Sequence, residues 1–188
     1  ADRLRIISCA TTGSDHIERD ELNSRGIPVR TLKEDPEVLR HITPAAELSW
    51  ALLMACARKL CPAVAHTRSG QWVREEFPGI MLNGKHLGLI GCGRIGEWMT
   101  RYAQAFGMTV SAFDPYRAKF PNGVAKASLE EVMSESDFIS VHVHLSDETR
   151  GLVSREMFDR VRQGAVFINT SRGAIVDEVA LLEALESG

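Results

Sequence analysis

The chain of 188 residues has few cysteines and no pattern among them that binds a metal or forms a redox pair. Its four cysteines, Cys9, Cys56, Cys61 and Cys92, make no C-x-x-C pair and no cysteine–histidine cluster with zinc spacing. We therefore predict no metal site, and we expect each thiol to lie buried as a small apolar side chain. This use of cysteine fits a reducing compartment, so the sequence predicts a cytoplasmic protein.

The sequence also lacks long apolar runs and any excess of basic charge. No run approaches the ~20 apolar residues that a membrane-spanning helix needs, and the first residues lead into a predicted strand rather than a signal peptide. A formal net charge of −3 gives no reason to expect nucleic acid or an anionic membrane surface as a partner. The apolar fraction of 44% is nevertheless enough to form a core.

The most specific feature that is present is a glycine turn between a predicted strand and a predicted helix. An apolar run, 87–90, ends at Gly91, Gly93 and Gly96, which are spaced G-x-G-x-x-G, and a helical pattern follows to about Phe106. Gly91 permits a tight turn, Gly93 lets a pyrophosphate approach the backbone, and Gly96 lets helix and strand pack closely. The helix N-terminus adds N–H groups and the positive end of its dipole. A glycine turn with a purely structural role is the alternative, but its flanking elements favour a dinucleotide site.

An acidic residue stands where such a site needs one. A second predicted strand, Met108 to Phe113, ends at Asp114, about 20 residues beyond the last glycine. Its carboxylate is placed to accept hydrogen bonds from the adenosine ribose and would repel the extra phosphate of NADP. The sequence therefore predicts NAD as the cofactor, although nearby Arg117 leaves NADP open.

The remaining pattern predicts an α/β fold with a doubly wound parallel sheet, because strands alternate with helices over short loops. We expect a buried strand at 4–9, a helix at 18–25, and a long helix from Thr43 to about Cys61 that Pro62 bends or interrupts. The segment 69–79 is predicted to be a loop with aromatic anchors. Beyond Asp114 we expect helices at 128–135, 154–162 and 177–185 and strands at 138–143 and 165–169.

Ligands of such sheets bind beyond the carboxyl ends of the strands, so the residues at these ends are candidate site residues. Gly91, Asp114, His142 and Asn169 each mark one such end, and their loops should meet in one crevice. Arg172 follows the last predicted strand and carries a planar fork of donors suited to a carboxylate. Sequence position alone supports this role and that of an ordinary surface arginine equally.

Together these segments resemble the D-specific 2-hydroxyacid dehydrogenase family, and within it the phosphoglycerate dehydrogenases. The resemblance is carried by 89–96, 113–115, 142–145 and 169–177, with further matches at 12–15 and 46–48. It covers nearly the whole chain. It implies a Rossmann-type NAD-binding domain at 43–188 that lacks its last strand or strands, preceded at 1–42 by the C-terminal part of a substrate-binding domain.

The resemblance implies contacts with the adenosine and pyrophosphate parts of the cofactor. Arg94 and Ile95, which lie between the second and third glycines of the turn, would contact the pyrophosphate. Asp114 would contact the adenosine ribose. His142 and Val143 would line the adenosine side of the pocket.

The resemblance also implies contacts near the reacting atoms. Thr170 and Ser171 would lie near the nicotinamide, and Thr12 would help close the crevice from the substrate side. Arg172 matches the catalytic arginine of the family, which binds the substrate carboxylate and the C2 oxygen. His144 departs from the family, which usually has proline there; without a third ligand in the sequence we interpret it as pocket lining rather than part of a metal site.

The function implied is the NAD-binding domain of an oxidoreductase that transfers hydride between a nicotinamide cofactor and a small D-2-hydroxy acid or 2-keto acid. The histidine and glutamate that act with the arginine in this family have no counterpart before Gly188, so we expect the piece alone to be inactive. One alternative is a non-catalytic, corepressor-like module that senses NAD(H). A hydrolase that uses NAD transiently is another, and the match at 169–177 argues against it.

A homodimer is also expected. The predicted helix from Ala45 to Leu60, with Trp50, Leu53 and Met54, has more apolar surface than one contact face requires. Burial between domains is the alternative for this helix.

Overall fold

The structure is a computed structural model that describes residues 3–187, in which the chain divides into two compact units, 1–43 and 44–188. The first unit contains β1 (Ile7–Cys9), α1 (Arg19–Ser24), β2 (Val29–Thr31), a 3-10 turn (Leu32–Glu34) and α2 (Pro36–Arg40). Its two strands pair in parallel. The expected buried strand at 4–9 is only three residues long, and Leu4 and Ile6 are exposed. A two-stranded sheet has too little surface of its own to bury these side chains.

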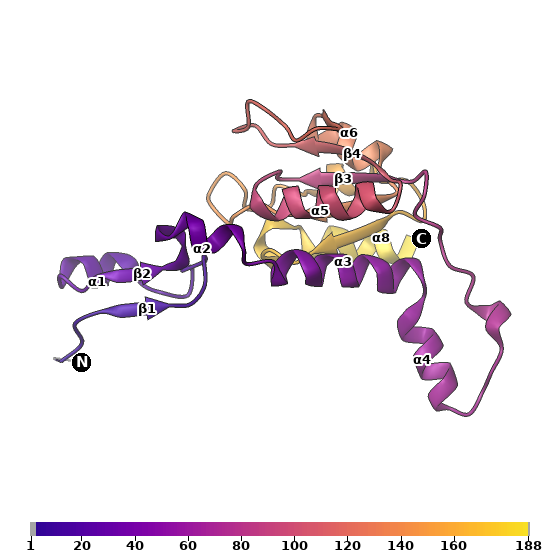
Figure 1. Cartoon of the computed structure of the whole chain (residues 1–188), viewed down its shortest axis with the longest axis horizontal. Coiled ribbons are helices and arrows are strands. Elements are labelled where there is room, and N and C mark those ends of the chain that lie inside the picture. The colour runs from indigo at the N-terminus through magenta and orange to yellow at the C-terminus, as the bar shows by residue number, and fades with distance from the viewer. Residues whose placement is uncertain (1–2, 188) are drawn as a thin grey trace. The chain divides into compact units, whose positions relative to one another are not determined.

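The second unit is built on a five-stranded parallel sheet with the order β5-β4-β3-β6-β7 (Figure 1). The strands are β3 (His86–Ile90), β4 (Thr109–Phe113), β5 (Val124–Lys126), β6 (Phe138–Val141) and β7 (Val166–Asn169). Ile90 lies opposite both Phe113 and Val141, and Val141 lies opposite Asn169. The carboxyl ends of four strands are therefore level with one another, at one edge of the sheet. This arrangement confirms the predicted fold class; β5 is a strand that the sequence analysis did not predict.

Helices cover both faces of this sheet. One face carries α3 (Pro44–Ala57) and α5 (Arg94–Ala105), and the other carries α6 (Leu129–Glu135), α7 (Arg155–Phe158) and α8 (Glu178–Ser187). The alternation of side chains along β3 explains the two layers, because Leu87 and Leu89 pack into the first core and Ile90 packs into the second. All three side chains are fully buried.

The long helix predicted from Thr43 to Cys61 is two helices. It ends at Ala57, Lys59 adopts the left-handed conformation with φ 49°, and α4 (Leu60–Arg68) begins beyond it. Pro62 lies in the first turn of α4, where its missing N–H has no acceptor within the helix. The predicted helix is therefore interrupted, but at 58–59 and not at Pro62, which lies in the second helix.

Apolar residues of α3 point to more than one side. The three residues named in the sequence as surplus apolar surface lie on the side that packs against the core. Leu53 is buried, while Trp50 and Met54 pack against the core, Trp50 at 5.2 Å between its ring centroid and that of Phe106. Leu48 and Leu52 are the large apolar side chains of this helix that are exposed. The helix is apolar around most of its circumference, so one stripe is buried and another remains on the surface.

Two further expectations are only partly correct: the aromatic anchors of 69–79 and the burial of the four thiols. The loop 69–79 is not anchored by Trp72, whose surface is 84% exposed; Phe77 instead packs edge-on against His66. The thiols of Cys56 and Cys61 are exposed, whereas Cys92 is buried, because the two former residues lie on the outer surface where α3 ends and α4 begins.

Within residues 3–187 no single helix is long and apolar enough to span a membrane, and a bent pair, Pro36–Ala57 with Leu60–Arg68, meets that test only by length and composition. No group of three or more histidine, cysteine, aspartate or glutamate side chains in this range is placed to hold a metal ion.

Candidate functional site

The glycine turn after β3 is closely packed at two of its glycines and open at the third. Gly91 has φ 92°, and a Cβ atom there would lie 2.7 Å from the carbonyl oxygen of His142. A Cβ on Gly96 would lie 2.7 Å from the carbonyl oxygen of Gly91, whereas a Cβ on Gly93 would meet no atom within 4 Å. The turn therefore leaves space at Gly93, where a bound group can approach the backbone.

Helix α5 begins at this open glycine. Its first backbone bond runs from the N–H of Glu97 to the carbonyl oxygen of Gly93 at 2.9 Å, so the N–H groups of the first turn precede it. A glycine in the N-cap position brings no side chain that competes for those N–H groups. Together with the positive end of the helix dipole, this geometry suits a pyrophosphate.

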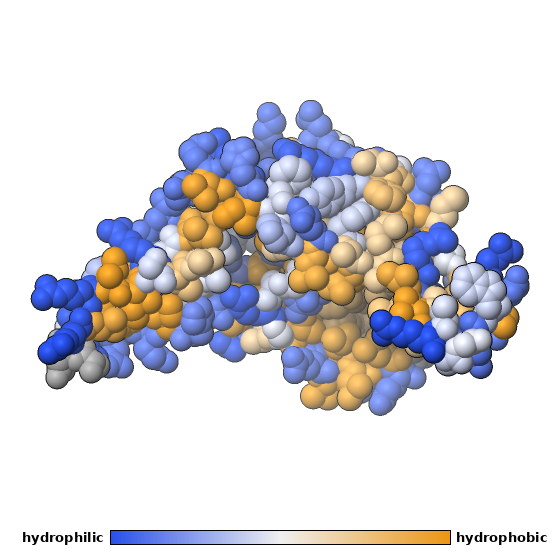
Figure 2. Space-filling model, turned by 60° about the horizontal axis from the view of Figure 1, so that its bottom comes forward, coloured by the Kyte–Doolittle hydropathy of each residue, from blue (hydrophilic) through white to orange (hydrophobic). Residues whose placement is uncertain are grey.

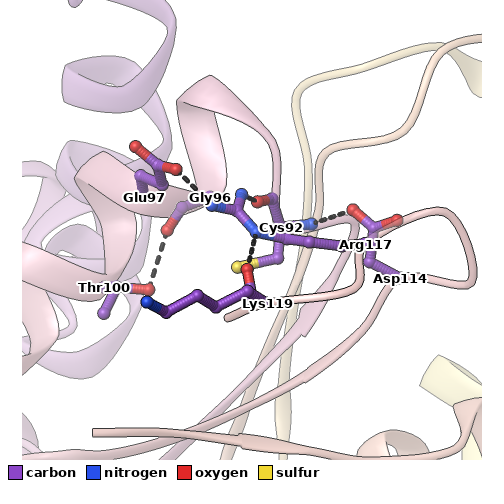
Figure 3. A network of polar contacts seen from close by, with 7 residues as sticks. All are labelled: Cys92, Gly96, Glu97, Thr100, Asp114, Arg117 and Lys119. Atoms are coloured by element: carbon purple, nitrogen blue, oxygen red, sulfur yellow. Dashed lines mark hydrogen bonds and ion pairs between the residues drawn. The ribbon is translucent and has the colours of Figure 1, made fainter. Parts of the chain in front are cut away.

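Asp114 is fixed beside the turn at the end of β4. Its Oδ2 accepts a hydrogen bond from the backbone N–H of Cys92 at 2.9 Å (Figure 3). Its Oδ1 accepts one from the N–H of Tyr116 at 3.1 Å. A carboxylate offers about four lone-pair positions, so two bonds leave capacity for ribose hydroxyls. The carboxylate is half-buried, and its orientation is set before any ligand binds.

Arg117 binds the same turn from its other side. Its guanidinium donates to the carbonyl oxygen of Cys92, to Glu97 Oε1 at 2.5 Å and to the carbonyl oxygen of Lys119 at 2.8 Å (Figure 3). The hydrogen bond with Glu97 raises the pKa of Arg117 above its usual value, with further contributions from nearby charges. Glu97 is a site residue that the sequence pattern did not identify. Two features of the sequence could have indicated its pairing with Arg117: a glutamate in the first turn of the helix, and an arginine three residues after Asp114.

His142 and Val143 follow β6 and lie against the glycine turn. A Cβ on Gly91 would be 2.8 Å from Val143 Cγ1, so the two strand ends are in contact. His142 Nε2 is 2.9 Å from Ser140 Oγ, and burial lowers the pKa of His142 to about 4. The imidazole is therefore neutral near pH 7. His144 is exposed and lies in the loop that follows.

The loop after β7 is organised by the side chain of Asn169. Its Oδ1 accepts bonds from the Ser171 N–H at 3.0 Å and the Ser171 hydroxyl at 2.7 Å, and its Nδ2 donates to the Arg172 carbonyl at 3.1 Å. Arg172 is exposed, and its Nη1 donates to the Ser171 carbonyl at 3.0 Å. These contacts hold the residue at the carboxyl edge with its donors on the surface.

Thr170 connects this loop to α3. Its hydroxyl is 2.7 Å from Ser49 Oγ, and Ser49 itself donates to the carbonyl oxygen of Ala45. Because the single proton of Ser49 is used in that bond, Thr170 is the donor between the two hydroxyls. Ser49 was not among the predicted residues.

The structure brings most of the predicted site residues to one edge of the sheet. The loops after β3, β4, β6 and β7 carry Gly91, Gly93, Arg94, Ile95, Gly96, Asp114, His142, Val143, Thr170, Ser171 and Arg172. The side chain of Ile95 packs against the core, which leaves its backbone as the group that can face a ligand. Thr12 lies in the first unit, half-buried, and is described within that unit alone.

The opposite edge holds a separate polar cluster around a cavity. Asp137 accepts from the N–H of His86 at 2.8 Å and pairs with Arg162 at 3.0 Å and Lys85 at 3.5 Å. Both cations are satisfied by this carboxylate, and the cluster lies at the amino ends of β3, β6 and β7. It stabilises that edge and takes no part in the candidate site.

Comparison with known proteins finds similarity across the region that carries the candidate site. The family model described as "D-isomer specific 2-hydroxyacid dehydrogenase, NAD binding domain" matches residues 50–188. The chain is 39% identical to a glyoxylate reductase of Korarchaeum cryptofilum and 36% identical to a D-3-phosphoglycerate dehydrogenase of Methanocaldococcus jannaschii. Both matches cover the whole chain, but 57% and 36% of those two proteins.

A solved structure agrees with these matches. D-lactate dehydrogenase from Aquifex aeolicus, complexed with NAD and lactic acid, superposes with a TM-score of 0.84 at 31% identity. The match covers 99% of this chain and 55% of that one. The resemblance drawn from the glycine turn and the segment 169–177 is confirmed, and the chain spans only part of the length of these relatives.

Proposed function

The chain belongs to the family of NAD-binding domains of D-isomer specific 2-hydroxyacid dehydrogenases, and on that premise we propose how its carboxyl edge holds the cofactor and serves the reaction. In our proposal the whole protein transfers hydride between a nicotinamide cofactor and a small D-2-hydroxy acid or the matching 2-keto acid. The activity is proposed for the whole protein because the chain spans 36% to 57% of the relatives named above.

One observation carries the proposed placement of the cofactor: the turn is open at Gly93 and has a fixed carboxylate beside it. The pyrophosphate would lie over Gly93 and receive hydrogen bonds from the first turn of α5, at Arg94 and Ile95. The adenosine ribose would bind Asp114, with His142 and Val143 beside it. Asp114 also favours NAD, because its charge repels a phosphate on the ribose.

The nicotinamide end would reach the loop after β7. We place Thr170 and Ser171 beside the nicotinamide, and Arg172 at the substrate, where its planar donors bind the carboxylate and the C2 oxygen. NAD, when bound, supplies the hydride acceptor or donor. The positive charge of Arg172 stabilises negative charge on the C2 oxygen, which is the contribution of this chain to the chemical step.

The proton transfer that accompanies hydride transfer is not assigned to the residues of this edge. His142 is half-buried and hydrogen-bonded to Ser140, and burial lowers its pKa to about 4, so it is a poor general base near neutral pH. We propose that residues of the whole protein outside this chain hold and move the proton, and that 1–188 alone is inactive. Thr12 would close the crevice from the substrate side.

We also propose a cytoplasmic homodimer. Apolar side chains reach the surface along α3, α4 and the segment that follows: Leu48, Leu52, Leu60, Val64, Trp72 and Met81. Figure 2, which turns this side of the second unit toward the viewer, shows several apolar patches on the surface. A second copy of the chain is the partner that we propose for them.

The placement of the cofactor is tested by calorimetry with NADH. Asp114→Ala should weaken binding about tenfold or more, because it removes charge-assisted hydrogen bonds to the ribose. Asp159→Asn, at an exposed acid beside α7, is the matched control and should bind as the wild type does. Equal affinity of Asp114→Ala and wild type would contradict the placement.

The role of Arg172 is tested by kinetics of the whole protein. Arg172→Lys keeps the charge but loses the fork of donors, so we expect kcat/KM to fall by about two orders of magnitude or more while NADH affinity stays within twofold. A lysine variant with near wild-type turnover would show that Arg172 does not bind the substrate.

A further inference from the structure

The glycine turn is held from two sides by groups of opposite charge. The Asp114 carboxylate accepts the N–H of Cys92, and the Arg117 guanidinium donates to the carbonyl of the same residue. Figure 3 shows Arg117 reaching from the loop after β4, past Cys92, to Glu97 on the first turn of α5. Both backbone groups of Cys92 are thus fixed next to Gly93, where the pyrophosphate is placed.

Glu97 is an unusual neighbour for a bound anion. As an acid in the first turn of α5 it interacts well with the helix dipole, but it adds negative charge where the pyrophosphate would bind. Arg117 neutralises it at 2.5 Å, and the side chains of the pair are 25% and 40% exposed. An arginine next to the ribose acid is also the group that would accommodate a ribose phosphate in NADP-dependent sites.

We propose that Glu97 is a specificity-determining residue: by holding Arg117 on the glycine turn, it withholds from the ribose a cation that would otherwise bind the additional phosphate of NADPH. Discrimination against NADPH then has two sources. Asp114 repels the phosphate. The Glu97 carboxylate binds the Arg117 guanidinium and keeps it where it also donates to the carbonyl oxygens of Cys92 and Lys119. This inference rests on the proposed placement of the ribose at Asp114.

The test compares the dissociation constants of NADH and NADPH for four forms of the protein, each with Asp114 intact. In Glu97→Ala the guanidinium loses its charged acceptor and keeps only the two carbonyl oxygens, so it can turn toward a ribose phosphate. We expect the NADPH-to-NADH ratio of dissociation constants to fall about tenfold, the size of one charge-assisted hydrogen bond. In Glu97→Ala/Arg117→Met the ratio should return to the wild-type value or above it. Arg117→Met alone should weaken both cofactors alike and leave the ratio unchanged.

Glu186→Ala is the control for removal of a negative charge elsewhere on the surface. Glu186 is exposed near the end of α8, so its replacement should leave the ratio of dissociation constants unchanged. If a methionine at 117 prevents folding, as judged by thermal unfolding, Arg117→Gln replaces it in both backgrounds. An unchanged ratio in Glu97→Ala, or a fall that persists without Arg117, would overturn the inference. Wild-type protein that binds no NADH would overturn the proposed site as well, and thereby the role of Glu97.

Discussion

Gly91 and Gly93 are two residues apart, yet the structure makes opposite demands on them. Gly91 has positive φ and lies against the backbone of His142, so a side chain there meets protein. Gly93 has an ordinary φ of −76° and faces open space, so a side chain there would contact a bound ligand but no atom of the protein within 4 Å. The same residue type is needed for folding at one position and for binding at the other.

Alanine substitutions should separate these two demands. Gly93→Ala should change the free energy of unfolding by less than about 0.5 kcal/mol but weaken NADH binding at least tenfold, because its Cβ occupies the space of the pyrophosphate. Gly91→Ala should lower the free energy of unfolding by about 2 kcal/mol or more through strain and overpacking. Denaturant titration and calorimetry measure both; unimpaired NADH binding by Gly93→Ala would contradict the placement.

His142 gives the protein a predictable response to acid. Burial lowers its pKa from the usual 6.5 to about 4, so between these values the unfolded chain binds a proton that the folded protein does not. The free energy of unfolding should therefore fall as the pH decreases from 6.5 to 4, by up to about 3 kcal/mol from this residue.

Denaturant titrations across this pH range check the prediction by difference. His142→Gln keeps a polar partner for Ser140 but does not titrate, so its stability should depend less on pH than that of the wild type. The exposed His41→Gln serves as the control for a histidine substitution elsewhere on the surface. Parallel curves for wild type and His142→Gln would mean that the pKa of His142 is not depressed.

At the level of elements, α6 shows how far a local sequence signal reaches. Ser128 is the N-cap of this helix, which the sequence predicts at 128–135. Its Oγ accepts the N–H of Glu131 at 3.2 Å, while Glu131 Oε2 accepts the N–H of Ser128 at 2.7 Å. The hydrogen bond from the Ser128 N–H to the Glu131 carboxylate, with a further contribution from the Ser128 side chain, holds the pKa of Glu131 below its usual value. The capping box joins residues only three positions apart, so a signal of this kind can be read from the sequence alone.

Ser128→Ala should lower the free energy of unfolding by about 1 kcal/mol, the usual cost of losing an N-cap. Ser134→Ala in the same helix, whose hydroxyl makes only a long bond of 3.5 Å to the Glu131 carbonyl, is the matched control and should cost less than about 0.5 kcal/mol. Nuclear magnetic resonance should also show the pKa of Glu131 rising in Ser128→Ala. Equal stability of the two variants would show that the box does not stabilise the helix.

Other elements depended on contacts that no local pattern reveals. The break between α3 and α4 is set by the left-handed Lys59, a residue type that gives no warning of it. The three-residue β5 exists because it pairs with β4 at the edge of the sheet. Sequence spacing placed the glycines, Asp114 and Arg172 after strands, as the structure has them. The pairs Glu97–Arg117 and Ser49–Thr170 join segments whose proximity only the fold creates.

At the level of the whole molecule, the exposed apolar residues along α3, α4 and the segment that follows predict self-association. Trp72→Ser should shift sedimentation equilibrium toward the monomer, because an aromatic side chain that is 84% exposed would contribute strongly to an interface. Leu185→Ser, at a 71% exposed residue on α8, should leave the association constant unchanged. A wild-type protein that stays monomeric over a hundredfold range of concentration would contradict the homodimer.

The contact between α3 and β7 has a consequence for biosynthesis. Ser49 receives its hydrogen bond from Thr170, 121 residues later in the chain. At bacterial to eukaryotic rates of translation, the helix leaves the ribosome on the order of ten seconds before that strand. During this interval the glycine turn and Asp114 are already synthesised, but one side of α3 lacks its strand. Nascent chains stalled before residue 166 should therefore be cut by proteases within α3 and retained by chaperones, and release should coincide with the emergence of β7.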